Sequence, residues 1–140
     1  MTKTSAKRRS NPFKAARKQH SEEAAEDYVE LVYDLIEEKN EARTGDIAEH
    51  LGVSHVTALR TIRRLQSEGY LVTSDRKPVS LSSKGKTLAL FCKKRHEILL
   101  DFFQFLGVPK SQAEIDVEGA EHHISKKTLG CILKHMDKAN

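Results

Sequence analysis

The chain has 140 residues and a formal net charge of +4, with 31% charged and 38% hydrophobic residues. No apolar run reaches the roughly 20 residues that a membrane-spanning helix needs, and the N-terminus lacks the apolar segment of a signal peptide. We therefore expect a cytoplasmic protein without a membrane partner, organised as one compact unit or two small subdomains. Cys92 and Cys131 lack the spacing of disulfide or metal-binding pairs, and we expect reduced thiols.

Residues 1–20 differ from the rest of the chain in charge. They carry seven Lys or Arg residues and no Asp or Glu, so the remainder of the chain is net negative. A basic segment with so few apolar residues cannot bury a core, which predicts a flexible arm. This arm either contacts the phosphate backbone of DNA or only keeps the chain soluble, and the sequence leaves both interpretations open.

A helical pattern follows the arm. Apolar residues recur at helical spacing through residues 21–39, and a short second helix follows, which Gly52 ends in a left-handed conformation. Ser54 is a favourable N-cap for a third helix over residues 55–68. Two helices joined by a tight turn that contains glycine are typical of a helix-turn-helix motif.

A β-hairpin is predicted directly after this motif. Tyr70–Thr73 and Val79–Leu81 alternate with period two on either side of a basic tip that contains Arg76 and Lys77. A hairpin that follows a helix-turn-helix is a far more specific signal than either part alone. Together they predict a winged helix-turn-helix domain over residues 21–90 that binds double-stranded DNA.

The third helix has one face suited to reading DNA. With Val56, Leu59, Ile62 and Leu65 turned inward, its polar residues form a stripe that fits a major groove. The alternative is a face that is merely solvated. The candidate DNA-binding residues of this helix and of the hairpin tip are Ser54, His55, Thr57, Arg60, Thr61, Arg63, Arg64, Arg76 and Lys77.

The C-terminal part is predicted to be entirely helical. A long helix covers residues 83–106, a helix that starts at a capping box in residues 111–114 continues to about His123, and Ser125 begins the last helix. Residues 91–140 are therefore expected to form an all-α domain. The fold class is mainly α with a small β-hairpin.

Glu118, Glu121 and His122 stand at positions i, i+3 and i+4 of a predicted helix, so they share one face. Two carboxylates and an imidazole there can bind a divalent cation, although a charged surface face is an equal alternative. Gly119 lies between them. A glycine inside a helix costs roughly 1 kcal/mol relative to alanine, which predicts a close backbone approach at this position.

Further donor side chains occur upstream. Asp27 and Glu30 stand at i and i+3 on the first helix, where they are either a second half of a metal site or a solvated helix start. His96 lies on the long helix, and by itself it indicates a packed histidine more than a metal ligand.

Three motifs are spaced along the chain: Glu26-Asp27-Tyr28-Val29-Glu30, Arg95-His96, and Asp116-Val117-Glu118-Gly119-Ala120-Glu121-His122-His123. Together they resemble the diphtheria-toxin-repressor family of metalloregulators, and within it the manganese-transport-regulator branch. The resemblance covers about residues 24–140 and leaves the basic arm outside.

The resemblance implies a metal-dependent repressor of metal-uptake genes that binds operator DNA as a homodimer. It implies two Mn(II) ions per protomer, in a site that bridges the DNA-binding and dimerisation domains. It also implies six metal ligands, which are Asp27, Glu30, His96, Glu118, Glu121 and His122.

Two positions bear on the choice of metal. The resemblance places a cysteine at Glu118 and a methionine at Asp27 in iron-responsive relatives, and sulfur ligands suit softer metals than carboxylates do. A shell rich in carboxylates therefore favours Mn(II), although iron, cobalt or zinc often bind a given site more tightly. An iron- or zinc-responsive regulator of the same family remains an alternative, as does a metal-independent winged-helix regulator.

An enzyme is the third alternative, because a binuclear carboxylate and histidine site can activate water. The sequence contains no evident pair of nucleophile and base, and its helices are largely used for DNA binding and dimerisation. We therefore expect a protein that is not an enzyme and has no small-molecule substrate.

Overall fold

The computed structural model describes residues 6–139, and the side chains from residue 13 onward. The order of elements is α1 (Ala6–Lys39), α2 (Thr44–Leu51), α3 (His55–Ser67), β1 (Leu71–Val72), β2 (Ser80–Leu81), α4 (Ser83–Phe105), α5 (Lys110–Ala120), the 3₁₀ turn η1 (Glu121–His123) and α6 (Lys126–Ala139). The predicted fold class, mainly α with one small hairpin, is confirmed. None of the helices within residues 6–139 is both long and apolar enough to cross a bilayer.

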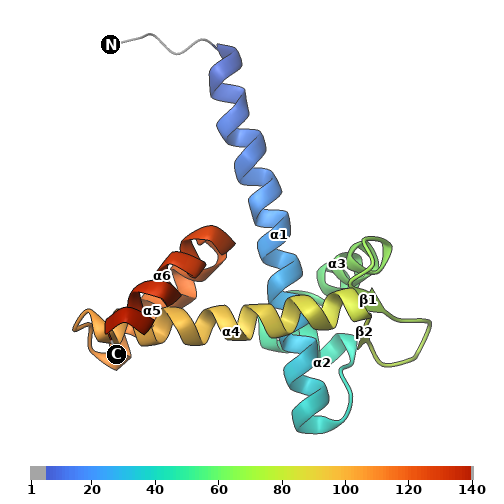
Figure 1. The fold of residues 1–140 in the computed structure, drawn as a ribbon. Helices are drawn as coiled ribbons and strands as arrows, with labels where there is room; N and C mark the ends of the chain where they lie inside the picture. The colour runs from blue at the N-terminus through green and yellow to red at the C-terminus, as the bar shows by residue number, and fades with distance from the viewer. Residues whose placement is uncertain (1–5, 140) are drawn as a thin grey trace.

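Helix α1 is longer than the sequence predicts. The expected helix starts at Ser21, whereas α1 begins at Ala6 and includes most of the segment expected to be a flexible arm. Its first turns project away from the other elements (Figure 1). Residues 1–5, which belong to the predicted arm, lie outside the described residues, and DNA binding by this basic segment stays a prediction.

The N-terminal elements pack around one apolar core. Val29 and Val32 of α1, Ile47 of α2, and Ile62 and Leu65 of α3 are fully buried in it. Burial of side chains of this size stabilises a fold by roughly 1.5–3 kcal/mol each before entropy is subtracted. This core fixes α3 against α1.

The local signals of the helix-turn-helix are confirmed. Gly52 has a φ of 67° at the end of α2, and the Ser54 side chain accepts a hydrogen bond from the Thr57 backbone N–H at 3.1 Å. The predicted inward position of Val56 is wrong, because this side chain is 66% exposed. Ala58, four residues before Ile62, occupies the buried face of the first turn instead.

The wing is a short antiparallel ladder. Leu71 pairs with Leu81 and Val72 with Ser80, so each strand is shorter than the alternating pattern predicts. An isolated bridge between Ala42 and Val79 attaches the returning strand to the loop before α2. The wing is therefore joined to the helix-turn-helix by backbone hydrogen bonds.

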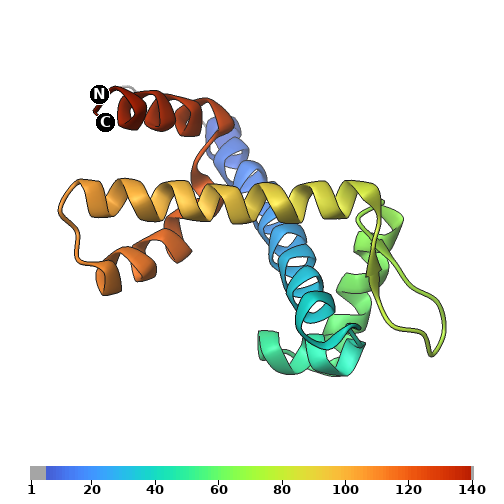
Figure 2. The same cartoon turned by 60° about the horizontal axis from the view of Figure 1, so that its bottom comes forward.

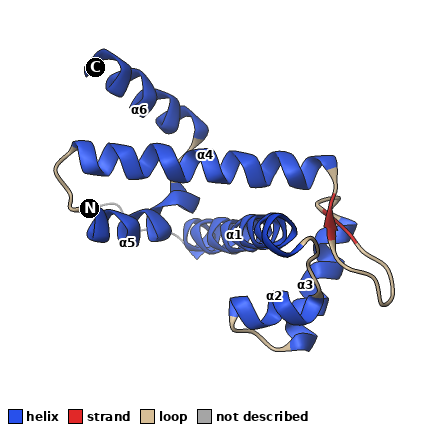
Figure 3. Ribbon diagram, turned by 90° about the horizontal axis from the view of Figure 1, so that it is seen from below, coloured by secondary structure: helices blue, strands red, loops and turns tan. Residues whose placement is uncertain are grey.

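Helix α4 runs through both halves of the molecule. It crosses α1, with the wing at its N-terminal end and α5 and α6 at its C-terminal half (Figures 2 and 3). Leu88 and Ala89 lie in the first core, whereas Leu99 packs with Val117 and Leu129 in a second one. The predicted domain boundary at residue 90 thus falls inside a continuous helix.

Two local expectations for the C-terminal half are wrong. The predicted capping box at Ser111 is absent, because α5 begins at Lys110 after Pro109, with no side-chain cap at that position. Gly119 has open space where a Cβ would be, so within residues 6–139 the expected close backbone approach is not found there. The close approach occurs at Gly85 of α4, where a Cβ would collide with the backbone carbonyl oxygen of Tyr70.

Candidate metal centre and DNA-binding face

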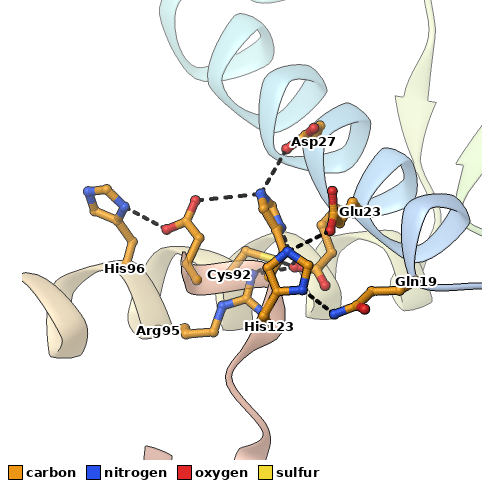
Figure 4. Close-up of polar contacts among 10 residues, drawn as sticks. Gln19, Glu23, Asp27, Cys92, Arg95, His96 and His123 are labelled. Carbon is orange, nitrogen blue, oxygen red and sulfur yellow. Dashed lines mark hydrogen bonds and ion pairs between the residues drawn. The ribbon is translucent and has the colours of Figure 1, made fainter. Parts of the chain in front are cut away.

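Four of the predicted ligands contact one another where α1 crosses α4 and meets η1. Nε2 of His122 lies 3.3 Å from Oδ1 of Asp27 and 3.8 Å from Oε1 of Glu121. The other oxygen of Glu121, Oε2, lies 2.8 Å from Nδ1 of His96. The contacts form a chain from Asp27 on α1 to His96 on α4 (Figure 4).

These donors suit a hard or borderline divalent cation. Metal–donor distances of about 2.0–2.2 Å place two donors of one ion roughly 3–4 Å apart, and the spacings around Nε2 of His122 fall in this range. Among the described residues, however, no three His, Cys, Asp or Glu side chains already surround a common point for an ion. The donors fit the metal in chemistry and in pairwise spacing.

The two predicted ligands on α1, Asp27 and Glu30, both have a pKa above the ordinary value. Burial raises the pKa of Asp27, and neighbouring carboxylates add to this rise while His122 opposes it. Burial also raises the pKa of Glu30, and the negative charge of Glu121 adds to it. Clustered carboxylates in a partly buried site repel one another when they are ionised, and a bound cation relieves this repulsion.

Glu118 is not brought into this group. It is exposed on α5, and the structure records no polar contact of its side chain within the described residues. The i, i+3, i+4 argument assumed one continuous α-helix, but α5 ends at Ala120 and Glu121 lies in η1. The change to a 3₁₀ turn directs Glu121 inward, where it is buried, and the ligand role of Glu118 stays a prediction.

A second layer of polar residues lies behind the predicted ligands, and the sequence argument missed it. Oε2 of Glu26 accepts hydrogen bonds from Arg95, from Nδ1 of His122 at 3.1 Å and from the Cys92 thiol at 3.4 Å. Glu26 and Arg95 both lie inside the recognised motifs. Glu26 precedes the buried Val29 by three residues, a spacing that places it on the inward face of α1.

Glu26 and Arg95 each stabilise the charged form of the other. Burial by itself would raise the pKa of Glu26, but the hydrogen bond and positive charge of Arg95 lower it on balance. Burial would lower the pKa of Arg95, and Glu26 in turn raises it. Burial strongly raises the pKa of the Cys92 thiol, and this thiol donates its hydrogen bond to Glu26.

A further set of contacts joins η1 to α1, closer to the N-terminus of α1 than Asp27. Nε2 of His123 lies 3.0 Å from Oε1 of Glu23, and Nδ1 of His123 contacts the Gln19 side chain (Figure 4). Gln19 belongs to the part of α1 that was expected to be a flexible arm. The turn η1 is therefore held against α1 over two helical turns.

The proposed DNA-reading face lies on α3 beside the wing. Thr57, Arg60 and Arg63 are exposed, as predicted. Arg64 is held instead by the Ser21 hydroxyl of α1 at 2.6 Å and by Glu68 at 3.2 Å. The remaining candidates on this face and on the wing tip, exposed or partly exposed, are Ser54, His55, Thr61, Arg76 and Lys77.

A cleft of about 420 Å³ separates α3 from the wing. Its basic lining residues include His55, Arg63 and Arg76, all predicted from the sequence, and also Arg43, which was not. Arg43 precedes α2, and its guanidinium donates to the backbone oxygen of Arg76 at 3.4 Å. The basic residues of this cleft suit phosphate contacts.

Comparison with known proteins places the chain in a family. Residues 21–79 match the family described as "Iron dependent repressor, N-terminal DNA binding domain", and residues 82–140 match "Iron dependent repressor, metal binding and dimerisation domain". The chain is 41% identical over 121 residues to the transcriptional regulator MntR of Salmonella typhimurium, covering 86% of this chain and 77% of that protein. The chain belongs to the iron-dependent repressor family.

Other members and solved structures agree. The HTH-type transcriptional regulator MntR of Bacillus subtilis is 41% identical over 104 residues, which cover 74% of this chain and 73% of that protein. A solved manganese-dependent transcriptional repressor in complex with manganese matches with a TM-score of 0.67 at 30% identity, covering 77% of this chain and 50% of that chain. The metal-dependent regulator MtsR shares the fold, with a TM-score of 0.72 at 24% identity over 81% of this chain and 53% of its own.

The chain spans about half the length of these solved structures. The resemblance drawn from the three sequence motifs is confirmed. Members of the iron-dependent repressor family are transcriptional repressors rather than enzymes. The chain is accordingly a metal-dependent transcriptional repressor with a DNA-binding N-terminal part and a metal-binding and dimerisation C-terminal part.

Proposed function

We propose that this chain is a Mn(II)-responsive repressor that acts in the cytoplasm and binds operator DNA as a homodimer. The observation that carries the proposal is the chain of contacts from Asp27 through His122 and Glu121 to His96, because it joins donors of the DNA-binding half to donors of the dimerisation half. The proposed site holds two ions per protomer. Its proposed ligands are Asp27, Glu30, His96, Glu118, Glu121 and His122.

The choice of manganese follows from the donor set and from the relatives. Four carboxylates and two imidazoles are a hard shell, which suits Mn(II) better than it suits the softer later metals. The Cys92 thiol donates a hydrogen bond to Glu26, which is not a proposed ligand, and Cys92 is not among the proposed ligands of this shell. The relatives named MntR and the solved manganese-dependent repressor support this choice over an iron or zinc sensor.

Helix α1 is the element that transmits metal binding to DNA. An ion held by Asp27, Glu121 and His96 would supply positive charge that offsets the repulsion among the clustered carboxylates, and these residues would then hold α1 to η1 and α4. Asp27 lies on the same helix as Ser21, and Ser21 accepts a hydrogen bond from Arg64 of the recognition helix α3. Restraint of α1 therefore restrains α3, and metal and DNA favour the same arrangement and tighten each other reciprocally.

The homodimer is supported by apolar residues that the single chain leaves exposed. Phe105 and Leu106 at the end of α4, Ile115 of α5 and Leu133 of α6 are all exposed large hydrophobic side chains. Exposed apolar residues are typical of an interface where they lie side by side, and these four belong to the segment that matches the family's metal binding and dimerisation domain. In a two-fold dimer the two α3 helices would contact the two half-sites of one operator.

A titration of operator binding tests the proposal. The probe is a duplex selected from random sequence by the Mn(II)-loaded protein, and fluorescence anisotropy is read at fixed salt. We expect Mn(II) to tighten binding by at least ten-fold over protein in chelator, and Glu121→Gln to lose this response. Glu114→Gln, an exposed carboxylate of α5, is the matched control and should behave as the wild type.

The alternatives make different predictions in the same assay. Equal affinity with chelator and with excess Mn(II) would identify a metal-independent winged-helix regulator and refute the proposal. A response to Fe(II) or Zn(II) but not to Mn(II) would identify an iron or zinc sensor. The three outcomes are separable because protein, duplex and salt are held constant.

We also propose that the exposed residues of α3 contact base edges while Arg64 holds the helix in place. Arg60→Ala is expected to weaken operator binding by about 1–3 kcal/mol if it reads a base. Lys86→Ala, an exposed lysine of α4 on no proposed DNA surface, is the control. Equal affinities of the Arg60 and Lys86 variants would remove Arg60 from the proposed face.

A further inference from the structure

Glu26 is not a proposed metal ligand, yet it lies at the centre of a group of buried polar side chains. One oxygen, Oε2, accepts hydrogen bonds from Arg95 of α4, from Nδ1 of His122 of η1 and from the Cys92 thiol of α4. The Arg95 side chain is 4% exposed and that of Glu26 is 13% exposed. A single carboxylate oxygen thus joins three elements beneath the proposed metal site.

The charge of Glu26 determines which nitrogen of His122 faces the site. Paired with a buried guanidinium, Glu26 is ionised, and an ionised carboxylate can only accept hydrogen bonds. Nδ1 of His122 must therefore carry a proton and donate it to Oε2. Nε2 is the atom that faces Asp27 and Glu121. It is therefore the nitrogen that would present its lone pair to a cation held between those carboxylates, once any proton that it shares with them is displaced.

We infer that Glu26, held in place by Arg95, is the positioning residue of the metal centre. It fixes the ring orientation and the tautomer of His122, so that Nε2 points toward the donors of α1 and η1. A carboxylate that orients a ligating histidine in this way commonly changes metal affinity by 10–100-fold when it is removed. The inference rests on the proposed metal-binding function of His122.

The Glu26–Arg95 pair also aligns the two helices without using a proposed ligand. The pair joins α1 to α4 one residue before Asp27 and one residue before His96. The helical positions of those two donors are therefore set by an ion pair that does not involve metal. A structural role by itself would stabilise the crossing, whereas the positioning role also predicts a specific tautomer of His122.

The test uses a double variant, Glu26→Leu with Arg95→Met, so that no buried charge is left without its partner. Mn(II) affinity of the full chain is measured by calorimetric titration, and the His122 tautomer of the metal-free chain by ¹⁵N NMR. In the wild type we expect Nδ1 of His122 to carry a proton and to donate it to Glu26. In the double variant we expect a mixture of tautomers and a 10–100-fold loss of Mn(II) affinity.

Two single variants sharpen the comparison. Glu26→Gln keeps an oxygen that can accept from both Arg95 and His122, so its Mn(II) affinity should fall by no more than a few-fold. Glu38→Gln, an exposed carboxylate on the same helix, should match the wild type in both measurements. Rescue by glutamine separates hydrogen-bonded positioning from an effect of charge alone.

The outcomes distinguish this inference from the proposed function. Wild type that does not bind Mn(II) would refute the proposed function, while the NMR arm on metal-free protein still decides whether Glu26 sets the tautomer. A double variant with Mn(II) affinity within two-fold of wild type would overturn the inference, as would an unchanged tautomer. Loss of both the tautomer and the affinity would support it.

Discussion

The buried ion pair between Glu26 and Arg95 leads to a prediction about stability. Arg95→Met removes the cation and leaves Glu26, which is 13% exposed, without its charge partner. Breaking one side of such a buried pair costs about 3–5 kcal/mol. This is a large part of the total stability of about 5–15 kcal/mol that is usual for a folded protein.

A loss of this size is easily measured by thermal unfolding. At about 3–4 °C per kcal/mol for a chain of this length, Arg95→Met should lower the Tm of the chelated protein by about 10–20 °C. Protomer concentration must be fixed, because dimerisation makes Tm depend on it. Glu41→Gln, which breaks an ion pair whose side chains are 52% and 48% exposed, is the control and should cost less than about 1 kcal/mol.

The double-mutant cycle can refute this reasoning. Glu26→Leu with Arg95→Met replaces the pair by apolar side chains, which is often neutral or stabilising in other proteins. We therefore expect the double variant to be within about 2 kcal/mol of wild type and more stable than Arg95→Met alone. If the losses of Arg95→Met and of Glu26→Leu, each measured as a single variant, simply add in the double variant, the pair is not coupled and the argument is wrong.

Three further predictions concern other positions. Burial raises the pKa of Asp27 above its ordinary value of 3.8. The folded, metal-free chain therefore favours protonated Asp27, and it loses stability as pH rises from about 4 through the raised pKa, because Asp27 ionises. Asp27→Asn should raise the chelated Tm at pH 7 and weaken Mn(II) binding; a lower Tm at pH 7 would contradict this. In urea unfolding, Gly85→Ala should destabilise by about 1–3 kcal/mol because the methyl group meets the Tyr70 carbonyl, whereas Gly119→Ala has open space and should stabilise by up to about 1 kcal/mol. Removal of residues 1–20 should flatten the slope of log affinity against log salt by roughly 0.9 for each phosphate that the segment neutralises, and an unchanged slope would mean that the segment does not bind DNA.

Local signals in the sequence predicted most of the secondary structure. The N-cap Ser54 and the left-handed Gly52 act within one helical turn, so their roles could be identified without the fold. The same approach was wrong for Val56 and for the start of α1 at Ala6. Whether a side chain in a terminal turn is buried depends on the neighbouring elements, and the sequence pattern around it is too short to decide.

Part of the candidate site could likewise be predicted from the sequence, and part could not. Spacing placed Asp27 with Glu30 and Glu121 with His122, and the resemblance joined these pairs with His96. The spacing argument did not separate Glu118, which is exposed, from Glu121, which is buried. That separation arises because α5 ends and η1 begins between them, a change of helix type that the residue pattern does not encode.

By itself the sequence determined the family, the order of elements and the kinds of donor atoms, because these depend on residue type and on spacing along one chain. Only the tertiary structure decided that Glu26 and Arg95 lie beneath the ligands and that Nε2 of His122 faces Asp27. The physical reason is distance along the chain. Residues far apart in sequence meet only after the apolar cores have placed α1 across α4, and charge pairing between them has no local periodicity to reveal it.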